Sequence, residues 1–252
     1  VFHSSGHSRL AQAAHVAYQP MARRTFDRAD AVLCSSDAER HDVVERYPFC
    51  AEWARVIPIA VDADRYDGVE PFVVDRPVIL SAGRLDRYKR VDTVIGAMAA
   101  LHADATLVVC GAGPDASRLR HLAETRGVAG RVRFAGAVPD AEIRRWQRTA
   151  TVTVSLSERE SFGLALAEAV VAGSRVVASD IPAHREMAAA MGASPAFVPC
   201  DATPDEVAVT LGEALAAGRP TSRDTTSRGW ADVARETIAA YEDALSRPRR
   251  GR

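Results

Sequence analysis

Short, mostly apolar runs alternate with helical segments along the chain from Val78 onward, and this alternation limits the fold more than any other feature. A strand that is apolar along its length is buried on both faces, as in parallel sheets. A helix between two such strands carries the chain back so that the next strand lies parallel to the last. The sequence therefore predicts an α/β fold with a parallel sheet covered by helices. The predicted strands are Val78–Gly83, Ala105–Gly111, Arg131–Gly136, Ala150–Leu156 and Arg175–Ser179.

The region from Gly68 to Pro77 has little periodicity and carries glycine, proline and acidic residues, which favours a domain boundary. Residues 1–70 are predicted to be the C-terminal portion of a preceding domain with its linker. Residues 71–228 form the second domain, 229–246 a terminal helix and 247–252 a disordered tail. The chain opens without Met, on what looks like a strand end, so we expect it to be part of a longer polypeptide.

Two local expectations concern helices outside the second domain. Residues 9–28 read as a helix that Pro20 should kink or split, because proline lacks the backbone donor. Trp230 should anchor the terminal helix in a core.

Composition narrows the class of protein. The 252 residues have a formal net charge of −1, which disfavours nucleic acid as the main partner. The four cysteines are widely spread without a C-x-x-C pair, so a disulfide framework and a cysteine metal site are disfavoured and a reducing cytoplasm fits best. No apolar run reaches the roughly 20 residues that span a bilayer.

The turn after the fourth strand carries two carboxylates, Glu160 in the loop and Glu168 on the helix that follows. Gly163 between them allows the backbone to approach a ligand closely. The free N–H groups at a helix start attract phosphate, whereas carboxylates accept from hydroxyl groups. A ligand with both, such as a nucleotide sugar, would explain the pairing.

Cationic and glycine-rich turns follow the other strands. Gly83-Arg84 and Lys89 lie directly after the first strand, where anions would bind. Gly111-Ala112-Gly113-Pro114 follows the second strand, and the loop at Val138 follows the third.

These residues together resemble glycosyltransferase family 4, retaining enzymes with the GT-B fold. The motifs that match are G-R-x4-K, G-x-G-P, F-x-G-x-V and S-x2-E-x-F-G-x4-E-A followed by a glycine. They read here as Gly83-Arg84…Lys89, Gly111-Ala112-Gly113-Pro114, Phe134…Gly136…Val138, and Ser157…Glu160…Phe162-Gly163…Glu168-Ala169 with Gly173. The resemblance implies a complete Rossmann-like C-terminal donor domain and the last part of a Rossmann-like N-terminal domain.

The resemblance also implies a role for each matching position. Arg84 and Lys89 would bind the donor diphosphate beside Gly83 and stabilise the leaving group without a metal or cofactor. Glu160 would contact hydroxyls of the transferred sugar, and Glu168 the ribose hydroxyls. Backbone groups near Phe162, Gly163 and Leu164 would meet phosphate and sugar, and Val138 would meet the base through its main chain. The competing interpretation is that these charged residues are solvated surface groups.

Three further candidates stay open. His3-Ser4-Ser5-Gly6-His7 resembles the family's H-G-T-G-H variant, with His3 placed near the donor sugar. His184 and Glu186 are predicted in a loop after the fifth strand, either lining the pocket or capping the next helix. Asp62-Ala63-Asp64 imitates a metal-binding D-x-D motif, but its place in a turn between domains favours a structural role.

The resemblance implies retaining, metal-independent hexosyl transfer from a UDP- or GDP-hexose to an acceptor hydroxyl on a sugar, a small molecule or a lipid-linked carrier. One alternative is a fragment that binds a nucleotide sugar without catalysis. Another is a sugar-nucleotide epimerase, which explains the Arg84–Lys89 pair less well. The expected location is cytoplasmic, with peripheral contact at the inner face of the membrane left open.

Overall fold

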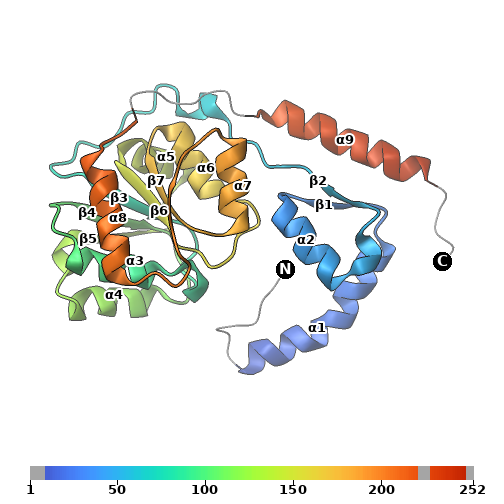
Figure 1. Cartoon of the computed structure of the whole chain (residues 1–252), viewed down its shortest axis with the longest axis horizontal. Coiled ribbons are helices and arrows are strands. Elements are labelled where there is room, and N and C mark those ends of the chain that lie inside the picture. The colour runs from blue at the N-terminus through green and yellow to red at the C-terminus, as the bar shows by residue number, and fades with distance from the viewer. Residues whose placement is uncertain (1–8, 221–227, 248–252) are drawn as a thin grey trace. The chain divides into compact units, whose positions relative to one another are not determined.

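The structure is a computed structural model that describes residues 9–220 and 228–247, with side chains from Tyr18 onward. The chain divides into two compact units (Figure 1), one of residues 1–60 with 228–252 and one of residues 61–227. No helix in these described ranges is long and apolar enough to cross a membrane.

The division differs in detail from the predicted boundary at residue 70. Residues 61–69 belong to the second unit, where Tyr66 is buried and its hydroxyl donates to Gln147. The terminal helix groups with the first unit.

In the described part of the second unit, six parallel strands form one sheet in the order β5-β4-β3-β6-β7-β8. This confirms the expected α/β class. The strands are β3 (Val78–Ala82), β4 (Thr106–Cys110), β5 (Val132–Gly136), β6 (Val152–Ser155), β7 (Arg175–Ser179) and β8 (Ala196–Val198). The last of them was not predicted, because three residues are too few to show a periodic pattern.

Helices cover both faces of this sheet. They are α3 (Val91–Ala100), α4 (Ala116–Thr125), α5 (Asp140–Thr149), α6 (Leu164–Ala172), α7 (Pro182–Ala190) and α8 (Pro204–Ala216). Single 3-10 turns are η2 (Ala63–Tyr66), η3 (Arg87–Lys89) and η4 (Ala129–Arg131). A capping box of Thr203 and Glu206 starts α8.

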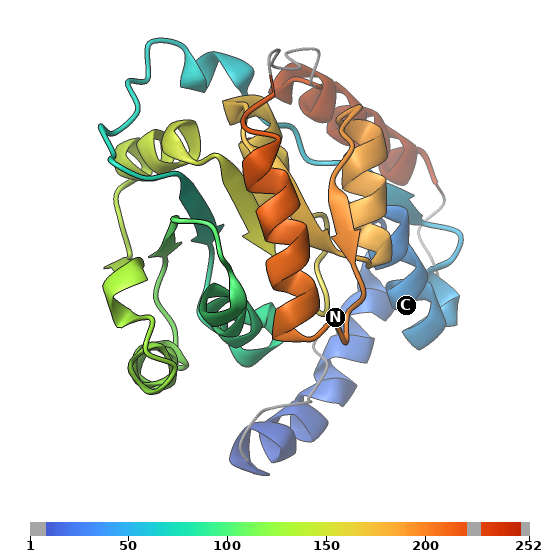
Figure 2. The same cartoon turned by 60° about the vertical axis from the view of Figure 1, so that its left-hand side comes forward.

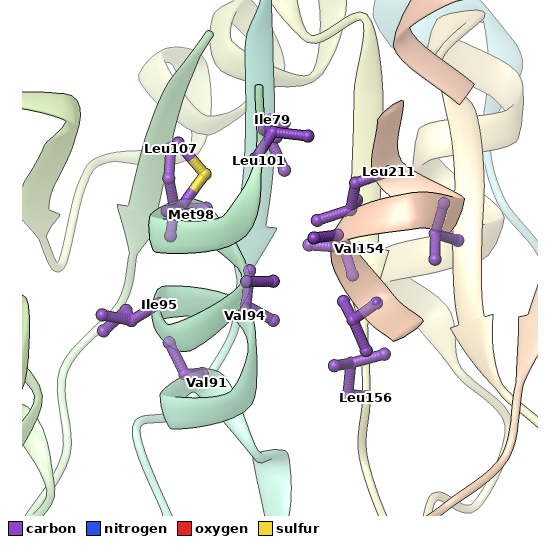
Figure 3. Close-up of a cluster of buried hydrophobic side chains, with 14 of the residues drawn as sticks. Ile79, Val91, Val94, Ile95, Met98, Leu101, Leu107, Val154, Leu156 and Leu211 are labelled. Carbon is purple, nitrogen blue, oxygen red and sulfur yellow. The ribbon is translucent and has the colours of Figure 1, made fainter. Parts of the chain in front are cut away.

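The main core lies between the sheet and the helices α3, α4 and α8. Figures 1 and 2 show α3 and α8 beside one another on this face. Ile95 and Met98 of α3 are fully buried, as are Leu107 of β4 and Leu211 of α8 (Figure 3). Helix α5 covers the opposite face. Its Trp146 belongs to a second cluster of buried side chains, together with Leu80 of β3 and Val108 of β4.

The first unit has a smaller core around two paired parallel strands. Its elements are α1 (Arg9–Arg28), β1 (Val32–Cys34), α2 (Asp37–Arg46), η1 (Pro48–Cys50), β2 (Ala54–Val56) and α9 (Trp230–Ser246). Helix α1 continues through Pro20 instead of splitting, since one missing donor leaves the bonds of the other turns in place. The expectation for Trp230 was wrong: its side chain is 54% exposed.

We predict that Leu211→Ala lowers the free energy of unfolding by about 2–5 kcal/mol, because it removes a fully buried side chain and leaves a cavity. Val209→Ala on the same helix is the matched control. Val209 is 63% exposed, so its loss should change stability by less than about 0.5 kcal/mol. Urea denaturation of both variants measures the difference, and equal losses would contradict this assignment of the core.

Candidate functional site

The order of the strands reverses beside β3, and this reversal determines where a ligand can enter the second unit. From β3 the chain continues to β4 and β5 on one side, and then returns to β6 on the other side. The connecting helices diverge at such a point and leave a crevice at the carboxyl ends of the strands. The loops after β3 and β6 flank this crevice, and both contain predicted site residues.

A cavity of about 420 Å³ lies there, within the second unit. It is lined by the ends of β3, β4 and β6, the loops after β3, β5 and β6, helix α5 and the first turns of α6. Lining residues are Ala82, Gly83, Lys89, Cys110, Gly111, Ala137, Val138, Ile143, Gln147, Ser155, Glu160, Gly163, Leu164, Ala165, Leu166 and Glu168. Seven of the ten predicted site residues are therefore in one place.

An ion pair joins the two loops. Lys89 Nζ lies 2.5 Å from Glu160 Oε1, and both side chains are about one-fifth exposed. The backbone N–H of Glu158 also donates to the Tyr88 carbonyl oxygen at 2.9 Å, which fixes the loops beside each other. An ammonium has three donors and a carboxylate two acceptor oxygens. The pair therefore retains donors for an anion and an acceptor oxygen for a hydroxyl group.

The start of α6 forms another wall of the cavity. Gly163 precedes the helix with φ of +92°, in the left-handed region that favours glycine. A Cβ at this position would lie 3.0 Å from Cδ2 of the buried His184, so only glycine leaves both the turn and the histidine undisturbed. The first N–H groups of α6 have no partner within the helix and carry the positive end of its dipole.

Glu168 lies one turn further along α6 and is held from two neighbouring elements. Gln147 of α5 donates from Nε2 to Glu168 Oε2 at 2.8 Å, and the Tyr66 hydroxyl of η2 donates to Gln147 Oε1 at 2.8 Å. Burial raises the pKa of Glu168 above its ordinary value, and the hydrogen bond from Gln147 opposes that shift. Glu168 is therefore held in a poorly solvated place by one hydrogen bond from Gln147, and Tyr66 in turn holds Gln147.

Close packing of backbone turns forms the remaining wall. Gly111, with φ of +141°, lies so close to Gly83 that a Cβ on it would overlap the Gly83 carbonyl oxygen. The two turns after β3 and β4 can approach only because these positions lack side chains. Val138 lines the cavity from the loop after β5.

Three predicted site residues lie elsewhere. The Arg84 side chain is 74% exposed and its Nε donates to Asp86 at 3.0 Å, outside the residues that line the cavity. Phe162 is buried beneath the turn. His3 lies outside the described residues. The roles given to these residues, as to those in the cavity, stay predictions.

Other positions were placed wrongly or missed. His184 and Glu186 are part of helix α7 and not of a loop, and His184 is buried with Nδ1 2.9 Å from the Ser179 carbonyl oxygen. Gln147 was missed, although Ile143 lies four residues before it on the same helix face and lines the same cavity. Among the described residues no cluster of histidine, cysteine and acidic side chains has the three members that could hold a metal ion.

Comparison with known proteins gives the family. Residues 62–215 match the family described as glycosyl transferases group 1, and residues 1–65 match glycosyltransferase family 4. The chain belongs to the group 1 glycosyltransferases. The matched range of 62–215 contains the whole cavity described above.

Curated relatives of the chain share limited sequence identity with it. D-inositol 3-phosphate glycosyltransferase of Xylanimonas cellulosilytica is 33% identical over 171 residues, which is 61% of this chain and 41% of that protein. The chain thus spans less than half of that curated relative.

Solved structures show the shared glycosyltransferase fold. Sucrose-phosphate synthase of Thermosynechococcus elongatus is 22% identical with a TM-score of 0.73, covering 89% of this chain and 61% of that one. Anabaena Alr3699/HepE, solved in complex with UDP and glucose, is 19% identical with a TM-score of 0.65, covering 85% of this chain and 59% of that one.

We predict that Glu168→Gln stabilises the protein increasingly as the pH rises. The folded-state pKa of Glu168 is raised, so the folded state favours the protonated form. Wild type keeps this stabilisation below the ordinary glutamate pKa and loses it as the pH rises through the raised value, whereas glutamine does not titrate. Denaturation of both proteins between about pH 4 and 8 measures the difference.

Glu45→Gln provides the control, because the Glu45 side chain on α2 is exposed. Its stability difference from wild type should change little with pH. A difference for Glu168→Gln that stays flat, or that shrinks as the pH rises, would contradict the burial assigned to this carboxylate.

Proposed function

We propose that the protein transfers a hexosyl group from a UDP- or GDP-hexose to an acceptor hydroxyl, with retention of anomeric configuration and without a metal ion. The whole-protein activity is a proposal because the chain spans only part of its relatives. The family membership supports glycosyl transfer in general, and the site supports the particular donor chemistry.

The observation that carries the proposal is the Lys89–Glu160 pair at 2.5 Å in the same cavity as the start of α6 and Glu168. A nucleoside diphosphate sugar has two phosphates flanked by hydroxyl groups on the ribose and on the hexose. The cavity offers cationic and N–H groups flanked by two carboxylates. That order of donors and acceptors is complementary to the order of groups in such a ligand.

In the proposed step the bond between the anomeric carbon and the diphosphate oxygen breaks, and its electron pair leaves with the nucleoside diphosphate. Lys89 stabilises the charge that develops on the departing oxygens. Arg84, whose exposed side chain pairs with Asp86 outside the cavity, would have to turn toward those oxygens to add to this effect. The acceptor hydroxyl oxygen bonds to the anomeric carbon from the face that the nucleotide leaves. Its proton passes to the leaving phosphate oxygen, so no nucleophile from the protein is required.

The amino-acid composition of the chain further supports the role proposed for Lys89. The chain has 32 lysine and arginine residues, and Lys89 is the one lysine among them. Arginine serves wherever a positive charge is needed elsewhere, so the compact ammonium at this position has a specific use. It can contact Glu160 and a phosphate oxygen from one point, which the planar guanidinium fork does less well.

The proposed donor is supported further by the UDP in the structure of Anabaena Alr3699/HepE, which has the same fold. The proposed acceptor is a hydroxyl on a sugar, a small molecule or a lipid-linked carrier. Donor binding without transfer is the second candidate, and it is favoured by one observation: every residue that lines the cavity belongs to the second unit. Release of UDP or GDP from a panel of hexose donors separates transfer and hydrolysis from binding alone.

We predict that Lys89→Met weakens binding of UDP or GDP at least about tenfold, because a buried contact from an ammonium to a diphosphate is lost. Binding of uridine or guanosine should change much less, since neither has a diphosphate. Calorimetric titration measures both. Arg76→Met is the matched control, because Arg76 lies just before β3, at the end of that strand away from the cavity, and is about half exposed.

Isotopic labelling of lysine supplies a direct readout, because a single lysine gives a single set of side-chain signals. Titration with the bound nucleotide should shift the Lys89 Cε–Hε signal in wild type and in Arg76→Met. A failure of wild type to bind either nucleotide, or wild-type affinity in Lys89→Met, would refute the proposed donor site.

A further inference from the structure

We infer that Tyr66 and Gln147 are positioning residues that hold Glu168 as a carboxylate with one oxygen free for the ribose of the donor. This inference rests on the proposed function. It adds Tyr66 of η2 to the site and gives a role to Gln147 of α5, which lines the cavity.

The three side chains form one directional chain of hydrogen bonds. Tyr66 and Gln147 are only 3% and 1% exposed, so both of their hydrogen bonds are largely shielded from water. The Tyr66 hydroxyl donates to Gln147 Oε1, and Gln147 Nε2 donates to Glu168 Oε2, each at 2.8 Å. No described residue donates to Glu168 Oε1. Both Gln147 and Glu168 line the cavity, so that oxygen is the one left for a ligand.

The orientation of the Gln147 amide follows from the charge of Glu168. An ionised carboxylate only accepts hydrogen bonds, so the amide must present Nε2 to it. Oε1 then faces Tyr66, whose hydroxyl has a proton to donate. Each group in this arrangement has the partner that it needs.

Protonation of Glu168 has two possible positions, and each weakens the network. A proton on Oε2 would have to be donated to Gln147 Oε1, so the amide would turn and leave the buried Tyr66 proton without a described acceptor, which is costly. A proton on Oε1 leaves Oε2 to accept from Gln147 Nε2 as before, but as a neutral carbonyl oxygen, and a hydrogen bond to a neutral acceptor is weaker than one to a charged acceptor. The amide orientation that Tyr66 fixes therefore favours the ionised form of Glu168.

The charged groups packed around Glu168 are distributed on both neighbouring elements. Arg65 of η2 and Arg144 of α5 favour its ionised form, whereas Asp140 at the start of α5 opposes it. Arg65 and Arg144 both pair with Asp140, so much of their charge is compensated there. Burial remains the largest influence and raises the pKa of Glu168. The bond from Gln147 is therefore the specific interaction that keeps the carboxylate ionised.

The test compares UDP with 2′,3′-dideoxy-UDP, because the ratio of their dissociation constants isolates the ribose hydroxyls and cancels titration of the phosphate. GDP and its dideoxy analogue replace them if GDP is the nucleotide that binds. Wild type should favour the diol at least about tenfold at neutral pH, as expected for hydrogen bonds to a charged group. The ratio should fall toward one as the pH falls through the pKa of Glu168.

Tyr66→Phe should reduce the ratio about threefold at neutral pH, which corresponds to one weakened hydrogen bond, and should move the fall of the ratio to higher pH. Gln147→Met should do both more strongly. Tyr47→Phe is the matched control, because it removes a tyrosine hydroxyl that donates to a glutamine oxygen at 3.4 Å in the other unit. It should leave the ratio and its pH dependence unchanged.

A second measurement does not depend on nucleotide binding. The stability difference between a protein and its Glu168→Gln variant, followed against pH, reports the protonation of Glu168. In the Tyr66→Phe background this curve should move to higher pH than in wild type. The inference is overturned if Tyr66→Phe changes neither the pH dependence of this stability difference nor the ratio of the two nucleotide dissociation constants. That result would leave the proposed function intact. Failure of wild type to bind either nucleotide would instead refute the proposed function and the ribose role with it.

Discussion

The reversal of strand order at β3 is the constraint on which the rest of the second unit depends. Because β6 must pair on the free side of β3, the loops after these two strands lie next to each other although they are about 70 residues apart in sequence. A parallel sheet of this order has one crevice at its switch point that the connecting helices leave uncovered. Lys89, Glu160 and the start of α6 meet there as a direct consequence of topology.

The charges in that crevice show how such a place is kept stable before a ligand arrives. Lys89 and Glu160 are each about one-fifth exposed, and neither would be well solvated alone. A desolvated pair is stable only with close geometry, and removal of one member leaves the other uncompensated. The pair therefore holds a donor and an acceptor in position with almost no net charge, as the proposed nucleotide-sugar donor would require.

Patterns that are local in sequence were predictable, and contacts between distant single residues were not. Apolar strands, the first three ending in glycine, indicated β3 to β7, and the turns after β3 and β6 identified Lys89, Glu160 and Gly163. Tyr66 and Gln147 are 81 residues apart, and a lone polar residue on each element has no spacing that reveals its partner. The prediction that Trp230 is buried was wrong for a related reason. Helical periodicity shows which residues share one face of a helix, but it does not show which surface covers that face.

The two faces of the sheet differ in composition: one is packed with apolar side chains, and the other contains the polar side chains next to the cavity. The face under α3, α4 and α8 is packed with apolar side chains, including Ile95, Met98 and Leu211. The face under α5 and α6 has Gln147 buried beside Glu168, and burial raises the pKa of that carboxyl group. A polar network in such a place stabilises the fold less than apolar packing of the same volume would. Its presence is therefore better explained by the proposed need for a fixed carboxylate at the cavity wall, and the apolar packing on the opposite face offsets the cost of burying that carboxylate.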